Sequence, residues 1–266
     1  MTATTSALLQ TAVQAARRAG KLQREGLYRR KRINEIAAHD IKLEMDVVSQ
    51  RVITETLMRK FPNAALLGEE GAVENPGADF RWVVDPLDGT ANYFNTLPIF
   101  AVSIAWQRRI GKNWRTDIGV VYDPMQDELF TATRGGPALL NGRRIRVANR
   151  WGLQDTMMVI GIFKDKHNIN RAMKLIRHFV HHVRKLRHLG SAAIDACWVA
   201  CGRLDAYLEP GVKIWDVAAG ALIIERAGGI APLEPTSDPN TWNIWASSRA
   251  IRPVLERELR KGGVRL

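Results

Sequence analysis

The pattern of hydrophobic and polar positions predicts helices near the N-terminus, strands in the middle and both in alternation afterwards. Apolar residues recur every three or four positions from Ser6 to Arg24, which is typical of one face of a helix. The basic stretch that follows, up to Asp40, indicates a loop or a short hairpin. Asp46 can cap a second helix, which Phe61-Pro62-Asn63 would end. The inward-facing residues of that helix are expected to be Val48, Val52, Ile53 and Leu57.

Short apolar runs then predict strands at residues 64–67, 82–84, 101–106, 118–122 and 129–133. From about Met157 the pattern changes. Strands at 157–162, 186–189 and 204–208 alternate with helices at about 172–183, 191–200 and 215–227. We therefore expect an N-terminal α+β half (1–150) and a layered C-terminal α/β half (151–266).

Composition narrows the class of protein. Hydrophobic residues make up 46% and charged residues 25% of the 266 positions, as in a soluble globular protein. The sequence contains no run of about 18 apolar residues that would suggest a membrane span. Met1–Gln10 lacks the features of a signal peptide. Cys197 and Cys201 are four residues apart, on one face of a predicted helix. They exclude a disulfide framework, so we expect a cytoplasmic protein.

The net charge of +12 has two interpretations. A basic surface attracts anionic substrates, including phosphates. It also suits contact with nucleic acid. The basic residues are spread along the chain, without zinc-finger spacing or an aromatic RNA-binding signature, so nucleic acid is expected to be a minor partner.

Three acidic clusters are each surrounded by apolar residues: Leu66–Gly71, Trp82–Asn92 and Ile214–Gly220. In the second cluster, Asp85 should end a buried strand, because Pro86 stops the ladder of hydrogen bonds. Asp88 then comes after the turn and can point back to the same place. Two carboxylates this close repel one another unless a cation lies between them, and Mg²⁺ prefers oxygen ligands.

Backbone N–H groups of Gly89 and Thr90, where a helix can begin, offer a cradle for phosphate beside this cation site. Adjacent cation and anion sites suit phosphoryl transfer to water. The alternative is that these acids only cap turns or helices, which is the usual role of an isolated D-x-x-D. The whole D-P-L-D-G-T string between a buried strand and a glycine favours the catalytic interpretation.

The three clusters together resemble the inositol monophosphatase family, and the bacterial extragenic-suppressor branch looks nearest. The resemblance rests on G-E-E at Gly68–Glu70, W-V-V-D-P-L-D-G-T-A-N at Trp82–Asn92 and W-D-V-A-A-G at Trp215–Gly220. These motifs occur in the family's order, and weaker similarity covers nearly the whole chain. The resemblance implies a layered α-β-α-β-α sandwich of the sugar-phosphatase type and a site with two to three Mg²⁺ ions.

By analogy, Glu69, Asp85 and the carbonyl of Leu87 would hold one ion. Asp85, Asp88 and Asp216 would hold a second, and Glu69 would help to place a third. Glu69 and the Thr90 hydroxyl would orient the attacking water. The N–H groups of Gly89 and Thr90 would bind the phosphate, while Glu209 and Ala192 would lie against the rest of the substrate.

One departure from the family concerns its D-x-V-T-x-x-D string. Aligned on Asp46, the second acid of that string falls on Val52, which leaves the third metal in doubt. The family also implies inhibition by Li⁺ and a homodimer.

The expected function is Mg²⁺-dependent hydrolysis of inositol monophosphate or a similar polyol or sugar phosphate. Fructose bisphosphate, histidinol phosphate, a nucleotide bisphosphate and NADP stay open as substrates. The alternative of a different class is an RNA-associated regulatory protein that keeps the fold.

Overall fold

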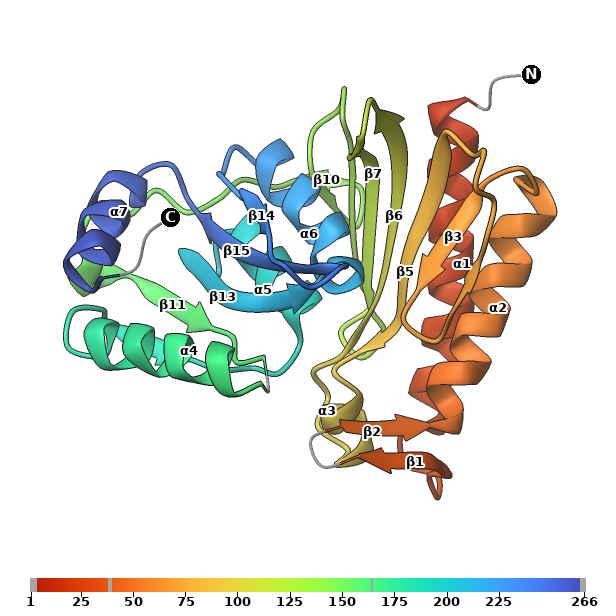
Figure 1. Cartoon of the computed structure of the whole chain (residues 1–266), viewed down its shortest axis with the longest axis horizontal. Helices are drawn as coiled ribbons and strands as arrows, with labels where there is room; N and C mark the ends of the chain where they lie inside the picture. Colours follow the sequence, from red (N-terminus) through yellow and green to blue (C-terminus); the bar gives the residue numbers. More distant parts are fainter. Residues whose placement is uncertain (1–3, 38–39, 164, 264–266) are drawn as a thin grey trace.

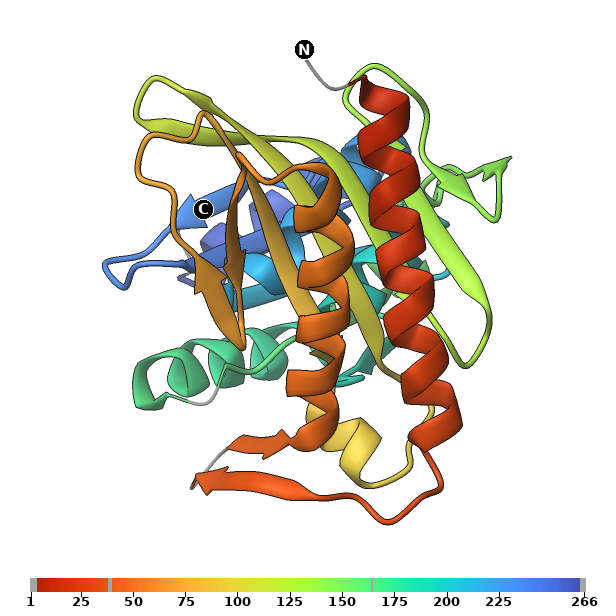
Figure 2. The same cartoon turned by 90° about the vertical axis from the view of Figure 1, so that its right-hand side faces the viewer.

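The structure is a computed structural model that describes residues 4–37, 40–163 and 165–263. Its helices and strands stack as α-β-α-β-α layers (Figure 1), which confirms the expected sandwich. In the first layer, α1 (Thr5–Gly26) and α2 (Glu44–Lys60) lie side by side across one face of a larger sheet (Figure 2). The remaining N-terminal elements are the antiparallel pair β1 (Ile33–Ala37) and β2 (Asp40–Leu43), so the hairpin interpretation of this stretch is confirmed.

The larger sheet has eight strands in the order β10-β9-β8-β7-β6-β5-β3-β4. Neighbours are antiparallel except β3 and β5, which are parallel. The strands are β3 (Ala65–Gly68), β4 (Gly71–Val73), β5 (Phe80–Asp88), β6 (Ala101–Ile110), β7 (Asn113–Asp123), β8 (Glu128–Thr133), β9 (Leu139–Leu140) and β10 (Arg143–Arg144). The short helix α3 (Thr90–Phe94) follows β5 directly.

The second half contributes the other three layers. Helices α5 (Ala192–Ala200) and α6 (Ile214–Arg226) lie between the two sheets, and α4 (Lys166–Phe179) and α7 (Arg252–Lys261) cover the outer face. The smaller sheet has the order β12-β11-β13-β15-β14. Its strands are β11 (Met157–Ile160), β12 (Lys185–Arg187), β13 (Ala206–Lys213), β14 (Leu233–Pro235) and β15 (Thr241–Ser247), and the 3₁₀ turn η1 (Leu153–Asp155) precedes them.

A hydrophobic cluster fills each space between layers. Small residues of α1, such as Ala12 and Ala16, pack against Trp82 and Val120 of the larger sheet. The central cluster joins the larger sheet to α5, α6 and the smaller sheet. The third packs α4 and α7 on the smaller sheet, with Phe179 and Leu259 among its fully buried side chains. Most of the predicted helices and strands are confirmed within a few residues of their bounds.

The prediction that Asp46 caps α2 is confirmed, although it does so from inside the helix, which begins at Glu44 and has Asp46 as its third residue. Its carboxylate reaches back to accept a hydrogen bond from the amide of Leu43, the residue before the helix (2.8 Å). The prediction that the strand ends at Asp85 was wrong, because β5 continues through Pro86 to Asp88.

In the described part of the chain, no helix is both long and apolar enough to cross a membrane.

Candidate active site

The second acidic cluster lies at an irregularity of β5. Asp85 pairs with Ser103 and Asp88 with Ala101, so three steps along β5 face two steps along β6. In a regular strand, residues three apart point to opposite faces. One extra residue, as in a β-bulge, returns the later side chain to the same face. The bulge thus allows Asp85 and Asp88 to face one site, and Pro86 is tolerated in the strand because the ladder is interrupted there.

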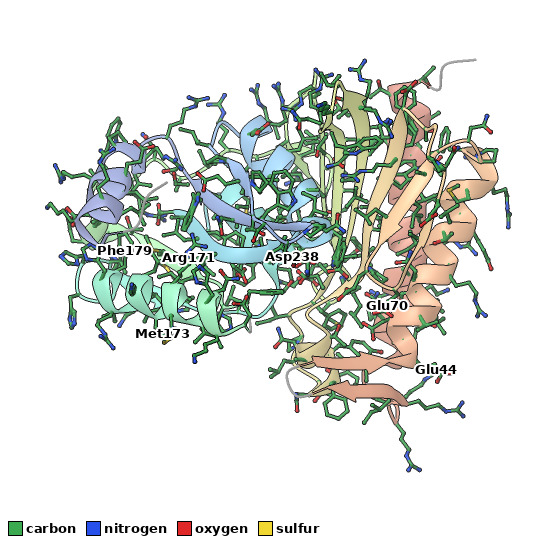
Figure 3. All side chains as sticks on the ribbon, viewed as in Figure 1. Glu44, Glu70, Arg171, Met173, Phe179 and Asp238 are labelled. Atoms are coloured by element: carbon green, nitrogen blue, oxygen red, sulfur yellow. The ribbon has the colours of Figure 1, made fainter. Side chains whose placement is uncertain are left out.

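Two further carboxylates from distant segments meet Asp85. Glu69 lies in the turn between β3 and β4, next to Glu70, which Figure 3 labels, and its amide donates to the Val84 carbonyl (3.1 Å). Asp216 is the third residue of α6. The Asp85 carboxyl shares hydrogen bonds with both Glu69 and Asp216. All three predicted clusters therefore contribute to one site, in which Asp85 is buried and the other two keep partial exposure.

Burial and mutual repulsion make ionisation of these acids unfavourable. Burial raises the pKa of Glu69 to about 8, helped by the charges of Glu70, Asp46 and Asp88 and opposed by its hydrogen bond with Asp85. Burial, followed by the charges of neighbouring acids, also raises the pKa values of Asp85 and Asp216 well above their ordinary range. The charges acting on these groups come from one another and from neighbouring acids, chiefly Asp88, and a bound cation would relieve that repulsion.

Asp88 is oriented by the second half of the chain. Its Oδ2 accepts hydrogen bonds from Ser191 Oγ (2.6 Å) and from the Ala193 amide (2.7 Å). The Ala192 amide contributes a further hydrogen bond at the start of α5. Burial raises the pKa of Asp88 to about 6, and these donors oppose the rise. Ala192 is thus brought to the site, although its predicted contact with substrate stays a prediction.

The Thr90 hydroxyl contacts an acid, Asp46, that was predicted only as a helix cap and as the first acid of the family string. Its Oγ1 lies 2.9 Å from Asp46 Oδ1 and 3.0 Å from the Leu87 carbonyl, so it can donate to either. Burial raises the pKa of Asp46 to about 6. Asp46, rather than residue 52, is therefore the acid that α2 brings to the site. Val52 sits further along α2, half-buried, and its lack of a carboxylate removes nothing from this contact.

Glu209 lies on β13 next to this cluster and is buried. It accepts a hydrogen bond from the Tyr207 hydroxyl. Burial raises its pKa to about 7, with a smaller contribution from the charge of Asp88 and an opposing one from Tyr207. Gly161 leaves room for it, because a Cβ there would come within 2.0 Å of Glu209 Oε2.

The donor set suits a hard divalent cation such as Mg²⁺, since it consists of carboxylate and backbone oxygens. As they stand, the described acidic, histidine and cysteine side chains form no group of three already set to hold a metal ion. A bound cation would have to replace the hydrogen bonds of Asp85 with Glu69 and Asp216. The residues fit the ion chemically, and binding would require loss of the shared protons.

Comparison with known proteins shows the family to which this chain belongs. The model of the inositol monophosphatase family matches residues 5–256, and the chain belongs to that family. It is 40% identical over 262 residues to "Nus factor SuhB" of Xylella fastidiosa, covering 94% of both chains. It is 38% identical over 263 residues to "Inositol-1-monophosphatase" of Mesorhizobium japonicum, covering 96% of this chain and 97% of that one.

Among solved structures, the extragenic suppressor protein suhB of Bartonella henselae superposes with a TM-score of 0.87 at 35% identity. The match covers 96% of this chain and 99% of that one. The family supports a phosphatase that acts on small phosphate esters, and the fold agrees with that.

Proposed function

We propose that the protein is a Mg²⁺-dependent phosphomonoesterase that hydrolyses inositol monophosphate or a similar small polyol or sugar phosphate. The observation that carries the proposal is the convergence of Glu69, Asp85 and Asp216 from three segments, with pKa values raised by burial and mutual charge. Membership of the inositol monophosphatase family supports the reaction class.

In this proposal, Glu69, Asp85 and the Leu87 carbonyl would hold one ion, and Asp85, Asp88 and Asp216 would hold another. Glu69 would also help to place a third ion, so that the site would take two to three. Bound Mg²⁺ would neutralise the phosphate, lower the pKa of water and stabilise the leaving alkoxide. No covalent enzyme intermediate is then required.

The chain's own groups would position the water and the ester. When Thr90 donates its proton to Asp46, a lone pair of its oxygen is free to accept a hydrogen bond from water. Glu69 would accept a second hydrogen bond from the same water, so the two residues would orient the oxygen that attacks phosphorus. The bond from the water oxygen to phosphorus would form as the bond from phosphorus to the ester oxygen breaks. The attacking water would release one proton to solvent, and the ester oxygen would take one up from solvent.

Backbone N–H groups of Gly89 and Thr90 would hold the phosphate. Gly89 has a φ of 97°, and a Cβ there would come within 2.9 Å of the Ile99 carbonyl oxygen. The tight approach therefore needs glycine. Asn92 fixes the same corner, because its Nδ2 donates to the carbonyls of Ile99 and Leu189 (both 2.8 Å). Glu209 and Ala192 would contact the substrate hydroxyls.

The substrate is tested by measuring phosphate release with Mg²⁺ from inositol 1-phosphate, fructose 1,6-bisphosphate, histidinol phosphate, adenosine 3′,5′-bisphosphate and NADP. We expect the strongest release from inositol 1-phosphate, since the buried carboxylate Glu209 suits hydroxyl groups. The variant Asp88→Asn should lose most turnover while keeping the wild-type circular dichroism spectrum. Near-wild-type turnover in that variant would remove the metal-site assignment.

Three further properties belong to the same proposal. Li⁺ at tens of millimolar should inhibit, because a small cation can occupy a Mg²⁺ site. The protein should form a homodimer, which sedimentation would show. Free thiols at Cys197 and Cys201 support a reducing compartment, the cytoplasm.

A second candidate function is an RNA-associated regulatory role. It is favoured by the net charge of +12 and by relatives named "Nus factor SuhB" at about 40% identity. Salt-dependent retention on an RNA column that survives Asp88→Asn, without phosphatase activity in the wild type, would favour this role over catalysis.

A further inference from the structure

A cavity of about 780 Å³ lies at the end of the larger sheet where α1 begins. Phe80, the first residue of β5, helps to line it, whereas Asp88 of the catalytic cluster is the last residue of the same strand. At about 3.3 Å per residue, the two ends of β5 are roughly 26 Å apart. Figure 1 accordingly shows the start of α1 at the opposite end of the sheet from α3. A ligand in this cavity would not touch the carboxylates.

One wall of the cavity is aromatic. The rings of Phe80 and Trp106 stack with centroids 5.4 Å apart and planes inclined by 10°. Trp106 is 7% exposed and Phe80 is 38% exposed, so Phe80 forms the outer layer of the stack. Phe61 packs against Trp106 from another side, at 6.1 Å between centroids. A stack that ends in an exposed ring is a platform for a further flat ring.

The lining beside these rings is strongly basic, and Arg108 is the direct cross-strand neighbour of Phe80. Lys60, Arg108, Arg115 and Arg134 line the cavity together with a single carboxylate, Asp117. That carboxylate accepts from Nε of both Arg108 (3.0 Å) and Arg115 (2.9 Å). Because these hydrogen bonds use Nε, the terminal nitrogens of both guanidinium groups remain as donors for an anion.

The remaining contacts agree with an anion site. Arg134 is held by the Thr116 carbonyl and by Glu225 (2.6 Å) outside the cavity wall, which fixes its guanidinium in place. Thr5 of α1 also lines the cavity, so the positive end of a 22-residue helix adds to the field. The volume falls in the range of pockets for small ligands, roughly 300 to 1,000 Å³.

We propose that this cavity binds a free mononucleotide, with the base stacked on Phe80 and the phosphate on Arg108 and Arg115. A purely apolar ligand would leave the terminal nitrogens of Arg108 and Arg115 unused, and inorganic phosphate would leave the aromatic platform unused. Base and phosphate together match the aromatic and the basic parts of the lining.

The test is titration calorimetry of the full chain with adenosine 5′-monophosphate in EDTA, where the catalytic site lacks Mg²⁺. We expect one saturable site, with binding at least tenfold weaker for adenosine and for ribose 5-phosphate. Arg115→Gln and Phe80→Leu should each weaken binding at least fivefold. The matched control Lys112→Gln removes a charge from the exposed turn between β6 and β7 and should leave nucleotide binding unchanged. Phosphate release from inositol 1-phosphate should be unchanged in all three variants.

Several outcomes would overturn the proposal. One is the absence of measurable binding. Another is binding that Arg115→Gln leaves intact and inositol 1-phosphate competes away, which would place the nucleotide at the carboxylates. A third is pentaadenylate binding at least tenfold tighter than the mononucleotide with the same sensitivity to Arg115→Gln. That result would identify the surface as one for single-stranded RNA.

Discussion

The Asp46 carboxylate accepts hydrogen bonds from two different parts of the chain. One carboxylate oxygen accepts from the Leu43 amide at the start of α2, and the other lies 2.9 Å from the Thr90 hydroxyl. Aligning the family string on Asp46 hides this role. Aligning it on Asp40 keeps the same six-residue spacing and puts its second acid on Asp46. That spacing is the signal from which the sequence analysis could have found the residue.

Asp46→Asn should lower kcat for phosphate release by about 10²-fold, with little change in KM. An asparagine has only one acceptor oxygen and cannot accept from both the Leu43 amide and the Thr90 hydroxyl, so the hydroxyl loses its fixed orientation toward water. Steady-state kinetics would measure the loss, and circular dichroism would check the fold. Glu55→Gln, an exposed change in the same helix, is the control and should keep wild-type kinetics. Equal effects of the two variants would contradict the role of Asp46.

Glu209 gives a prediction for the pH dependence of stability. Its pKa is about 7 in the folded protein against an ordinary value of 4.5, so the folded state binds its proton more tightly. The resulting stabilisation is fully present below about pH 4.5 and is lost as the pH rises through about 7. In EDTA, the urea midpoint of the wild type should therefore fall between about pH 5 and about pH 8.

Glu209→Gln keeps an acceptor for Tyr207 but cannot titrate, so its urea midpoint should fall less over the same pH range. Other buried acids contribute in the same direction in both proteins, and the comparison removes their effect. Parallel curves for wild type and variant would show that Glu209 does not titrate with a raised pKa.

At the scale of elements, Gln23 joins α1 to α2 and to β5. Its Nε2 donates to Ser49 Oγ (3.1 Å) and to the Pro86 carbonyl (2.6 Å), and its backbone carbonyl accepts from the Tyr93 hydroxyl. Pro86 lies inside the bulge that separates Asp85 from Asp88. The contact thus anchors the irregular part of β5 to the helix layer.

Gln23→Ala should lower the free energy of unfolding by roughly 2 kcal/mol, because it leaves a buried cavity and an unsatisfied carbonyl. Turnover should fall as well, since the bulge loses its anchor. Urea unfolding of the variant measures the first effect. Gln14→Ala, at an exposed position of α1, is the matched control and should change stability by less than about 0.5 kcal/mol.

The elements that the sequence predicted well are those with a strong period. The apolar stripe of α1 and the runs of β6 and β7 could be identified because one or both faces are buried. Neither β15 nor α7 was predicted from the sequence. The run Thr241–Ser247 mixes tryptophan with polar residues, and α7 is short and rich in charge. The continuation of β5 past Pro86 depends on the bulge, and no local sequence pattern predicts that bulge.

For the whole molecule, the site is where the two halves of the chain meet. Ser191 and Ala193 orient Asp88, and Ser103 Oγ of β6 donates to the Trp215 carbonyl (2.9 Å) beside Asp216. The central hydrophobic cluster also includes residues from both halves. The acidic cluster was predictable because its motifs are local. The hydrogen bonds that orient it were not, because they link residues about 100 positions apart, such as Asp88 and Ser191.

A cation bound by Asp88 and Asp216 would therefore connect the two halves and stabilise the folded chain. At a Mg²⁺ concentration a hundredfold above Kd, linkage predicts about 2.7 kcal/mol of added stability. For a chain of this size that corresponds to a rise in Tm of roughly 5–10 °C. Thermal unfolding with and without Mg²⁺ would measure the shift independently of catalysis.

Asp216→Asn should lose most of this shift, because it removes a charge from the second ion's ligands. The control Asp79→Asn changes an exposed loop residue and should keep the full shift. It removes an equal charge at the opposite end of β5 from Asp88. If Mg²⁺ raised the Tm of Asp216→Asn as much as that of the wild type, the ion would be bound elsewhere. The buried acids would then need another explanation, in which shared protons alone hold Glu69, Asp85 and Asp216 together.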